Sequence, residues 1–354
     1  PLSLEGLTGE ESEHFLQMHL QECNKCRNFR EELLIENEVV AFPTETVYGL
    51  GANARSEEAV HKIFAAKGRP SDNPLIIHIA DQKQLFDLVE EIPPVAEQLM
   101  NAFWPGPLTL VFRKKEGLSE GATAGLSTVA VRMPNHPIAL ALIEAADLPI
   151  AAPSANTSGK PSPTTAQHVA KDLTGKISGI VDGGETGVGV ESTVVDVTEG
   201  IPVILRPGGV TKEDIIEIVG EVREDLALHN IEVAPKSPGM KYTHYAPDAP
   251  FVLINGSEAY IQRFVSEQKQ LGKKVGVLTT EENQHAYDAD VVATCGRREQ
   301  LSTVATELYQ ALRTFDERDV DLIVGEVFPR VGIGEAIMNR LMKAAGHTLL
   351  TEES

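Results

Sequence analysis

Long apolar runs are missing from this chain of 354 residues, and so is any excess of positive charge. No apolar run approaches the ~18 residues that a transmembrane helix needs, and the acidic N-terminus lacks the basic and apolar regions of a signal peptide. We therefore expect a cytoplasmic protein that does not enter a membrane. The formal net charge of -21 argues against stable nucleic-acid binding, because such binding depends on Lys and Arg, but a local basic pocket for a small anion remains compatible with it.

Cysteine is scarce, and several well-known site motifs are absent. Three cysteines in a chain of this length argue against a disulfide framework. There is no G-x4-G-K-[ST] loop, and Gly187-Val188-Gly189 lacks the third glycine and the β-α context of a dinucleotide site. No serine stands in a G-x-S-x-G elbow, so a Ser-His-Asp hydrolase is a poor fit. If the chain binds ATP, it does so by an unconventional site.

Residues 1–38 form an atypical N-terminal segment. His19, Cys23 and Cys26 stand as H-x3-C-x2-C, which is half of a tetrahedral zinc site, with His14 as a doubtful fourth ligand. The segment resembles the zinc-binding segment of anti-sigma factors. An amphipathic surface helix with two reduced thiols is the alternative interpretation.

A first domain is expected over residues 39–228. Hydrophobic content of 42% and charged content of 23% are typical of globular proteins, and the length favours two domains. Short β-runs alternate with sparse helical patterns, which predicts an α/β domain with a mixed sheet. The expected strands are 39–42, 75–79, 108–112, 129–133, 149–152, 179–181, 193–197 and 203–205. The expected helices are 57–67, 93–103, 137–146, 163–173 with Ser162 as its N-cap, and 212–219.

The composition changes after this domain. Residues 229–250 hold four prolines and no hydrophobic period, which indicates an ordered linker or lid. Residues 251–354 then show a regular rhythm, which predicts a small Rossmann-like α/β domain with a parallel sheet. Its expected strands are 251–255, 274–279, 290–294 and 320–327, and its expected helices are 257–271, 301–313 and 333–345.

The helix over 57–67 ends beside two cations. Gly68 stops the helix, and Lys67 and Arg69 flank its end, which we expect to be exposed. Such cations often only partner the helix dipole, but two of them together also suit an anion. His78, in the next β-run, is either a satisfied sheet histidine or a ligand-binding group.

Polar residues also gather where other β-runs end. Ser154 and Asn156 follow a short apolar strand, where α/β proteins present ligand groups, although both also favour turns. Arg132 and Arg206 each end a β-run, and planar guanidinium groups suit polyphosphate or carboxylate. The glycine-rich stretch 183–193 is either a hairpin or a phosphate cradle. These groups favour charge neutralisation of an anionic substrate over acid–base chemistry.

Seven motifs follow one another over about 180 residues. They are FPTETVYGLGA, KGRP-x2-NPL-x2-H, WPGPLTL, VAVRMP, APSAN-x-SGKPSPT, GVGVEST and ILRPGG. Together they resemble the YrdC-like domain, and G-x4-H-Y-x-P at 239–247 resembles the lid segment of its two-domain members. The chain from 39 to 346 is thus similar to the two-domain L-threonylcarbamoyladenylate synthases.

This resemblance implies a fold and a reaction. The fold is a twisted mixed-sheet YrdC-like domain followed by the small parallel α/β domain. The reaction is that of a nucleotidyltransferase, which condenses L-threonine, bicarbonate and ATP to threonylcarbamoyl-AMP and pyrophosphate. A downstream tRNA-modifying transferase machinery takes the product to form N6-threonylcarbamoyladenosine. Mg²⁺ is implied with ATP, although no carboxylate cluster marks a metal site made by the protein.

The resemblance also implies site residues. Catalytic roles fall to Lys67 and Arg69. The implied ATP and phosphate contacts are Lys67, Arg69, Ser154, Asn156, Ser192 and Arg206. The implied threonine and carbamate contacts are Thr44, Tyr48, His78 and Arg132. The implied lid residues, which would keep water from a labile carbamate and mixed anhydride, are Tyr242, His244 and Tyr245.

Two other functions stay open. A non-catalytic RNA-binding module of the YrdC-like fold would require an affinity that falls steeply with salt. A carbamoyl transferase of hydrogenase maturation shares the domain, but its acylphosphatase and zinc-finger-like regions are not visible in the sequence. Residues 1–27 depart from the synthase family, whose members usually bring a strand and a helix into this region.

Overall fold

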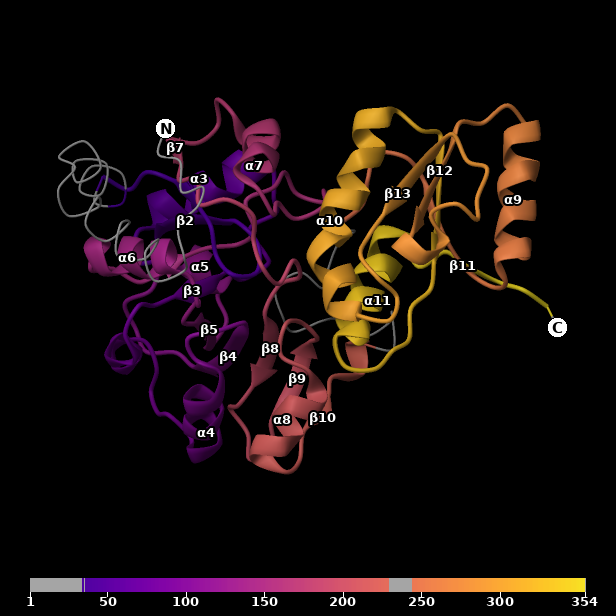
Figure 1. Cartoon of the computed structure of the whole chain (residues 1–354). Coiled ribbons are helices and arrows are strands. Elements are labelled where there is room, and N and C mark those ends of the chain that lie inside the picture. The colour runs from indigo at the N-terminus through magenta and orange to yellow at the C-terminus, as the bar shows by residue number, and fades with distance from the viewer. Residues whose placement is uncertain (1–33, 35, 229–243, 354) are drawn as a thin grey trace, which may run out of the picture.

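The computed structural model describes residues 34, 36–228 and 244–353. They form two bodies side by side, with the N-terminal body on the left of Figure 1 and the C-terminal body on the right. The possible zinc ligands His19, Cys23 and Cys26 lie outside the described residues, and so does Tyr242. Among the described helices, none is long and apolar enough to span a membrane.

The first body is built on one sheet with ten described strands. They are β1 (Val40–Phe42), β2 (Gly49–Asn53), β3 (Ile76–His78), β4 (Leu108–Arg113), β5 (Thr128–Arg132), β6 (Ile150–Ala151), β7 (Gly179–Ile180), β8 (Thr193–Asp196), β9 (Val203–Arg206) and β10 (Arg223–Glu224). Their order is β10-β9-β8-β4-β5-β3-β6-β2-β1-β7. Parallel pairs such as β3 with β5 occur beside antiparallel pairs such as β4 with β5, so the predicted mixed sheet is confirmed.

Helices surround this sheet. They are α3 (Glu57–Lys67), α4 (Pro94–Phe103), α5 (Glu120–Thr123), α6 (Pro137–Ala146), α7 (Ala166–Leu173) and α8 (Lys212–Val219). The Ser56 side chain caps α3 by accepting from the Ala59 N–H at 3.2 Å, and Gly68 ends it with a φ of 60°. Val60 and Ile63 of α3 are fully buried in the main core of the body. The start and the end of this helix are therefore fixed, and so is the position of the residues that follow it.

One local prediction is wrong, and several short elements, β2 among them, are not predicted from the sequence. Ser162 does not cap the helix at 163–173, because its hydroxyl donates to Glu191 Oε1 at 2.6 Å. Helix α7 starts later and is capped by Thr165. Strand β2 was not expected, because its GLGAN sequence has little β propensity. A Cβ at Gly51 would lie 2.6 Å from the Phe42 ring, so glycine at this position permits the close packing of β1 and β2.

The second body is the small parallel α/β domain that the sequence predicts. Its described strands are β11 (Phe251–Asn255), β12 (Val275–Thr279), β13 (Val291–Thr294), β14 (Leu322–Glu326) and β15 (Leu349–Thr351), in the order β13-β12-β14-β11-β15. Each pair of neighbours is parallel. Helix α9 (Glu258–Gln270) lies on the outer face of the sheet, whereas α10 (Leu301–Arg318) and α11 (Ile333–Ala344) lie between the sheet and the first body (Figure 1).

Helix α10 docks on the first body through one polar face. The side chains on this face are three or four residues apart, so they lie on one side of the helix. They are Thr306, Tyr309, Arg313 and Asp316. Their partners in the first body are, in the same order, the Gly187 carbonyl, Glu191, Asp172 and Lys160. The contact is close, because a Cβ at Gly189 would lie 2.3 Å from the Ala305 carbonyl oxygen.

Loss of the buried ion pair on this face should destabilise the protein. Arg313 Nη2 lies 2.9 Å from Asp172 Oδ2, and the two side chains are only 4% and 9% exposed. Replacing Arg313 by Ala leaves a buried carboxylate without its cation, so the free energy of unfolding should fall by about 3 kcal/mol. Equilibrium urea unfolding followed by circular dichroism measures this loss.

The matched control is Lys171→Ala. Lys171 pairs with Glu317 between the same two helices, α7 and α10, but both side chains are about half exposed, at 49% and 51%. Its loss should change the free energy of unfolding by less than about 1 kcal/mol. Equal unfolding midpoints for the two variants would contradict the importance that we assign to the buried pair.

Candidate active site

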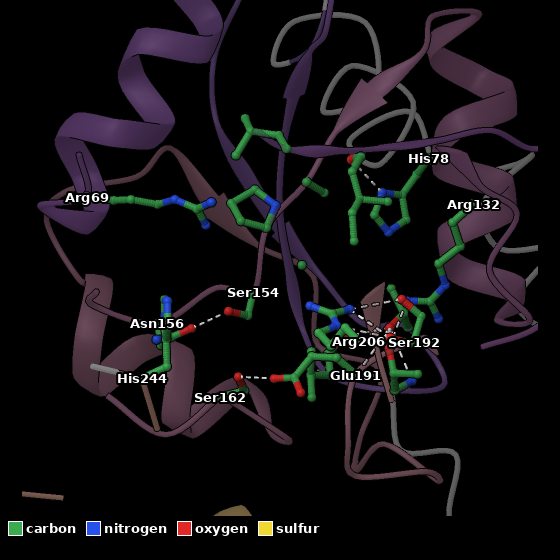
Figure 2. A pocket seen from close by; sticks show the side chains of 18 of the residues that line it. Arg69, His78, Arg132, Ser154, Asn156, Ser162, Glu191, Ser192, Arg206 and His244 are labelled. Carbon is green, nitrogen blue, oxygen red and sulfur yellow. Dashed lines mark hydrogen bonds between the residues drawn. The ribbon is translucent and has the colours of Figure 1, made fainter. Parts of the chain in front are cut away.

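A pocket lies in the first body, with His244 and Tyr245 among the residues that line it. Ten of the residues singled out from the sequence line it. They are Thr44, Arg69, His78, Arg132, Ser154, Asn156, Ser192, Arg206, His244 and Tyr245. Figure 2 shows Arg69, Ser154 and Asn156 on one side of the pocket, and Arg132, Ser192 and Arg206 on the other.

The sheet brings one side of the pocket together. Strands β3 and β5 are parallel, and their last residues, His78 and Arg132, are register partners. Arg206 ends β9, and Ser192 directly precedes β8, which runs antiparallel to β9. The sequence pattern located Arg132 and Arg206 at strand ends, and the strand order explains why all four residues meet.

His78 is a neutral imidazole in this pocket. Its Nδ1 lies 3.1 Å from the Ile76 carbonyl oxygen, which can only accept, so Nδ1 carries the proton. Burial, together with the charge of Arg132, lowers the pKa of His78 to about 3. Nε2 is therefore left as a hydrogen-bond acceptor at neutral pH.

Arg132 is held by the loop that follows β1. Its Nη1 donates to the Thr46 hydroxyl at 2.9 Å, and its Nη2 lies 2.6 Å from Glu45 Oε2. The Thr46 hydroxyl in turn lies 2.9 Å from the Thr44 hydroxyl. Thr46 lines the pocket, so it belongs to the site although the sequence-based assignment omitted it. Its position inside the first motif, beside Thr44, was the available signal.

Arg206 and Ser192 form a second fixed unit. The Arg206 guanidinium donates to the Ser192 carbonyl through Nε at 3.2 Å and through Nη2 at 2.8 Å, and Nη2 also reaches the Ser192 hydroxyl at 3.2 Å. The Ser192 hydroxyl is 2.7 Å from that of Thr109. A guanidinium and a hydroxyl are thus kept side by side on the pocket wall, an arrangement that suits phosphate oxygens.

Lys67 and Arg69 have different positions. Arg69 lines the pocket, and its Nη2 donates to the Asn73 carbonyl at 3.1 Å. Lys67 is only 2% exposed, so the expectation of an exposed helix end is wrong for it. Its ammonium donates to the Ser154 carbonyl and to the Asn156 carbonyl, the latter at 2.6 Å. Burial lowers the pKa of Lys67 well below its usual range, with a further contribution from Arg69.

Ser154 and Asn156 form a fixed loop above this ammonium. The Ser154 hydroxyl donates to Asn156 Oδ1 at 2.6 Å, and Asn156 Nδ2 donates to the Lys160 carbonyl at 2.9 Å. Lys67 does not line the pocket. It acts on the pocket indirectly, because it fixes the loop that carries Ser154 and Asn156.

Tyr48 is buried beneath a neighbouring loop, and it too is absent from the pocket lining. Its hydroxyl donates to the Gly184 carbonyl at 2.7 Å and accepts from the Gly183 N–H at 3.1 Å. Burial raises the pKa of Tyr48 to about 12. The residue therefore braces the glycine-rich segment that the sequence analysis considered as a phosphate cradle.

His244 and Tyr245 close one side of the pocket. Burial, with a smaller contribution from the charge of Lys343, lowers the pKa of His244 to about 3. The ring of Tyr245 stacks on that of Tyr309 from α10, with 5.4 Å between the centroids. Tyr245, which lies in the expected linker, thus joins the pocket to the second body.

The pocket lining also contains residues that the sequence-based assignment missed. Besides Thr46, they include Lys160, Ser162 and Glu191. Lys160 and Ser162 belong to a motif of which only Ser154 and Asn156 were chosen, and Glu191 stands directly before Ser192. Glu191 is the only acidic residue among the described lining residues, against the arginines at 69, 132 and 206. The pocket is therefore cationic in a chain of net charge -21.

Comparison with known proteins gives this pocket a context. A family model described as "Telomere recombination" (Sua5_yciO_yrdC) matches residues 32–208. A second model, described as "Threonylcarbamoyl-AMP synthase, C-terminal domain", matches residues 210–346. The two matches together span both bodies.

Two relatives that match most of this chain are named threonylcarbamoyl-AMP synthase. The threonylcarbamoyl-AMP synthase of Bacillus subtilis (strain 168) is 62% identical over 315 residues, which are 89% of this chain and 91% of the relative. That of Pyrococcus abyssi (strain GE5 / Orsay) is 53% identical over 320 residues, with coverage of 89% and 92%.

A solved structure matches both bodies at once. The crystal structure of P. abyssi Sua5 complexed with L-threonine has a TM-score of 0.88 and 50% sequence identity, and the match covers 93% of this chain and 96% of that one. The sequence identity, the two domain models and the shared fold lead to one conclusion: the chain belongs to the family of two-domain threonylcarbamoyl-AMP synthases.

Proposed function

We propose that this chain condenses L-threonine, bicarbonate and ATP to threonylcarbamoyl-AMP and pyrophosphate in the pocket described above. The observation that carries the proposal is the convergence of Arg69, Arg132 and Arg206 on a pocket that also presents hydroxyl groups and a neutral imidazole. Joining a carboxylate to a phosphate brings two anions together, so the site has to supply positive charge to both.

The ATP side of the pocket is proposed to consist of Arg69, Ser154, Asn156, Ser192 and Arg206. Ser192 and Arg206 form a fixed guanidinium–hydroxyl unit, and Arg69 faces it from the other side (Figure 2). Lys67, by contrast, is a positioning residue, because its ammonium binds the carbonyls of the loop that carries Ser154 and Asn156.

The threonine side is proposed to consist of Thr44, Thr46, His78 and Arg132. Arg132 offers charge to a carboxylate, and the unprotonated Nε2 of His78 accepts a hydrogen bond from the substrate's hydroxyl or ammonium group. Tyr48 supports this side from below, through the Gly183–Gly184 backbone. The placement of the side chains around the pocket supports these roles.

The proposed reaction has two steps. Threonine and bicarbonate first give N-carboxythreonine and water. An oxygen of the carbamate carboxylate of N-carboxythreonine then attacks the α-phosphorus of ATP. The bond from that phosphorus to the oxygen that bridges to the β-phosphate breaks, which releases pyrophosphate. The arginines neutralise the charge that builds up between the two anions. His244 and Tyr245 are proposed to limit the access of water to the labile carbamate and to the mixed anhydride.

Magnesium is proposed to enter the site on ATP. The described residues contain no group of three or more His, Cys, Asp or Glu side chains that could hold a metal ion. Glu191 is the acidic residue that faces the pocket, and its oxygens already accept hydrogen bonds from Ser162, Tyr309 and Arg340. The described residues therefore do not form a metal site of their own, and none of the proposed steps depends on one.

The remaining parts of the proposal concern the context of the reaction. A catalytic domain at 39–228, a linker at 229–250 and a C-terminal domain at 251–354 fit the two sheets. The product is proposed to pass to a tRNA-modifying transferase, in the cytoplasm where ATP, threonine and tRNA meet. The alternative, a non-catalytic RNA-binding module, is disfavoured by the family to which the chain belongs and by its net charge of -21.

The direct test is release of pyrophosphate from ATP by the purified chain. We expect release only when threonine and bicarbonate are both present, because the attacking carboxylate is made from the two. Mass spectrometry of the same mixtures should detect threonylcarbamoyl-AMP. Release that is indifferent to threonine would sink the proposal.

Replacing Arg132 by Met should separate the two sides of the pocket. Loss of a charged hydrogen-bond donor to the substrate carboxylate should raise the KM for threonine at least about tenfold, and should leave the KM for ATP within about twofold. Steady-state pyrophosphate release measures both constants. Arg113→Met, which removes an exposed arginine at the end of β4, serves as the control. Equal increases in the two KM values would contradict the division of the pocket.

His78 should make the folded protein sensitive to acid. Its pKa of about 3 in the folded protein lies below the ordinary value of 6.5. Between these values the unfolded chain binds a proton that the folded one does not, so stability falls as pH falls below about 6.5. At about pH 5 this contribution amounts to roughly 2 kcal/mol. His78→Gln should therefore lose less thermal stability than the parent chain between about pH 7.5 and 5, and an identical loss would refute the assignment.

A further inference from the structure

Glu191 carries a buried negative charge in the pocket wall, and the second body supplies two of its partners. Glu191 is only 7% exposed. Its Oε1 accepts from the Ser162 hydroxyl at 2.6 Å, and the Tyr309 hydroxyl lies 3.0 and 2.9 Å from the two carboxylate oxygens. Arg340 Nε donates to Oε2 at 2.8 Å. Tyr309 belongs to α10 and Arg340 to α11, so a pocket residue of the first body depends on the second.

Arg340 holds two segments of the pocket wall at the same time. It is fully buried, and its Nη1 donates to the Pro207 carbonyl at 2.9 Å while its Nε donates to Glu191. Glu191 directly precedes Ser192, and Pro207 directly follows Arg206. One guanidinium therefore fixes the neighbours of both residues on this wall of the proposed ATP site.

The same guanidinium also supports an aromatic wall of the pocket. Arg340 lies 5.5 Å from the ring centroid of Tyr245, which lines the pocket and stacks on Tyr309. A cation over an aromatic ring in a desolvated place is a favourable contact. Arg340 does not itself line the pocket, so any effect it has on a substrate passes through Glu191, Pro207 or Tyr245.

Arg340 stabilises the negative charge of Glu191. Burial alone would raise the pKa of Glu191, but the charges of Arg340 and Arg206, with the Ser162 hydrogen bond, bring it down to about 2. The group is therefore a carboxylate at neutral pH. A carboxylate in a pocket wall of low dielectric repels phosphate groups unless a cation neutralises it.

We propose that Arg340 is a positioning residue for ATP, contributed by the C-terminal domain. Together with Tyr309 it neutralises and fixes Glu191, so that Ser192 and Arg206 meet the phosphates without a competing negative charge. This inference rests on the proposed function, because it assigns ATP to that pocket. It gives the C-terminal domain a defined part in the reaction of the first domain.

The experiment compares full-length chains that carry Arg340→Gln, Glu191→Gln or both substitutions. Pyrophosphate release at saturating threonine and bicarbonate gives kcat and the KM for ATP. In Arg340→Gln the carboxylate loses its cation, so the KM for ATP should rise about tenfold or more while kcat changes less. The double variant removes both charges and should recover most of that increase.

The matched control is Arg298→Gln. Arg298 forms an ion pair with Glu326 at 2.5 Å inside the second domain, and neither residue lines the pocket. This variant loses the same charge from the same domain, and its KM for ATP should stay within about twofold of the parent value.

A pH profile distinguishes charge neutralisation from a purely structural role. Without Arg340 the pKa of Glu191 should rise, so the KM for ATP of Arg340→Gln should fall as the pH is lowered from about 8 to 6. The other titratable or charged groups that face Glu191 are Arg206, Tyr309, His244, Tyr245 and Lys343. Lys343, with a pKa of about 7 through burial and nearby arginines, also titrates in this range. The double variant keeps Lys343 but lacks the Glu191 carboxyl, so it measures the share of the fall that Lys343 causes, and the fall in Arg340→Gln should be clearly larger.

Several results would overturn the inference. An Arg340→Gln chain with a KM for ATP within about twofold of the parent would do so, and so would a double variant as impaired as the single one.

If Arg340→Gln does not fold, Tyr309→Phe replaces it. The KM for ATP should then rise about threefold, because a hydrogen bond to a charged group is lost, and an unchanged KM would overturn the inference. A parent chain without threonine-dependent pyrophosphate release is a separate outcome, because it removes the proposed function itself.

Discussion

The structure depends on the neutralisation of buried charge. The pocket gathers guanidinium groups from Arg69, Arg132 and Arg206, while the chain as a whole is strongly acidic, at -21. Each of these cations is held by backbone carbonyls or by a polar partner, so the protein itself fixes the positions of the guanidinium groups. Pre-organised donors of this kind are what the joining of two anions requires, because they need not reorganise as charge develops.

Residues of both domains take part in the neutralisation of buried charge. Helix α10 contacts the first domain along one polar face, and α11 contributes Arg340, whose side chain is completely buried. Buried polar contacts of this sort fix geometry more than they add stability, since desolvation offsets much of their attraction. We therefore infer that the main effect of the interface is to fix the positions of Glu191 and Tyr245.

The sequence predicted the fold class and most of the pocket, for a physical reason. Polar residues at the ends of apolar β-runs can present ligand groups, so Arg132 and Arg206 could be named as candidates from their positions. His78, Thr44 and Ser192 were assigned to the site only through the resemblance of their motifs. The strand order could not be read in the same way, because non-local pairing leaves no local pattern. Strand β2 was missed, since its glycines are explained only by the packing of Gly51 against Phe42.

The structure gives Lys67 and Tyr48 positions that the sequence does not predict, and it adds Glu191 to the pocket. Lys67 and Tyr48 carry groups that suit a ligand, but their burial and their carbonyl partners are properties of the folded chain alone. Glu191 was overlooked because an acidic residue in an acidic chain is unremarkable in the sequence. Only its partners from the second domain, Tyr309 and Arg340, reveal its importance.

The most direct test of the whole account is a crystal structure of the full chain with L-threonine and a non-hydrolysable ATP analogue. The account predicts the triphosphate beside Arg69, Ser192 and Arg206, and the amino acid beside His78 and Arg132, with Arg340 still bonded to Glu191. A nucleotide bound outside this pocket, or a pair Glu191–Arg340 that separates when ATP binds, would contradict it.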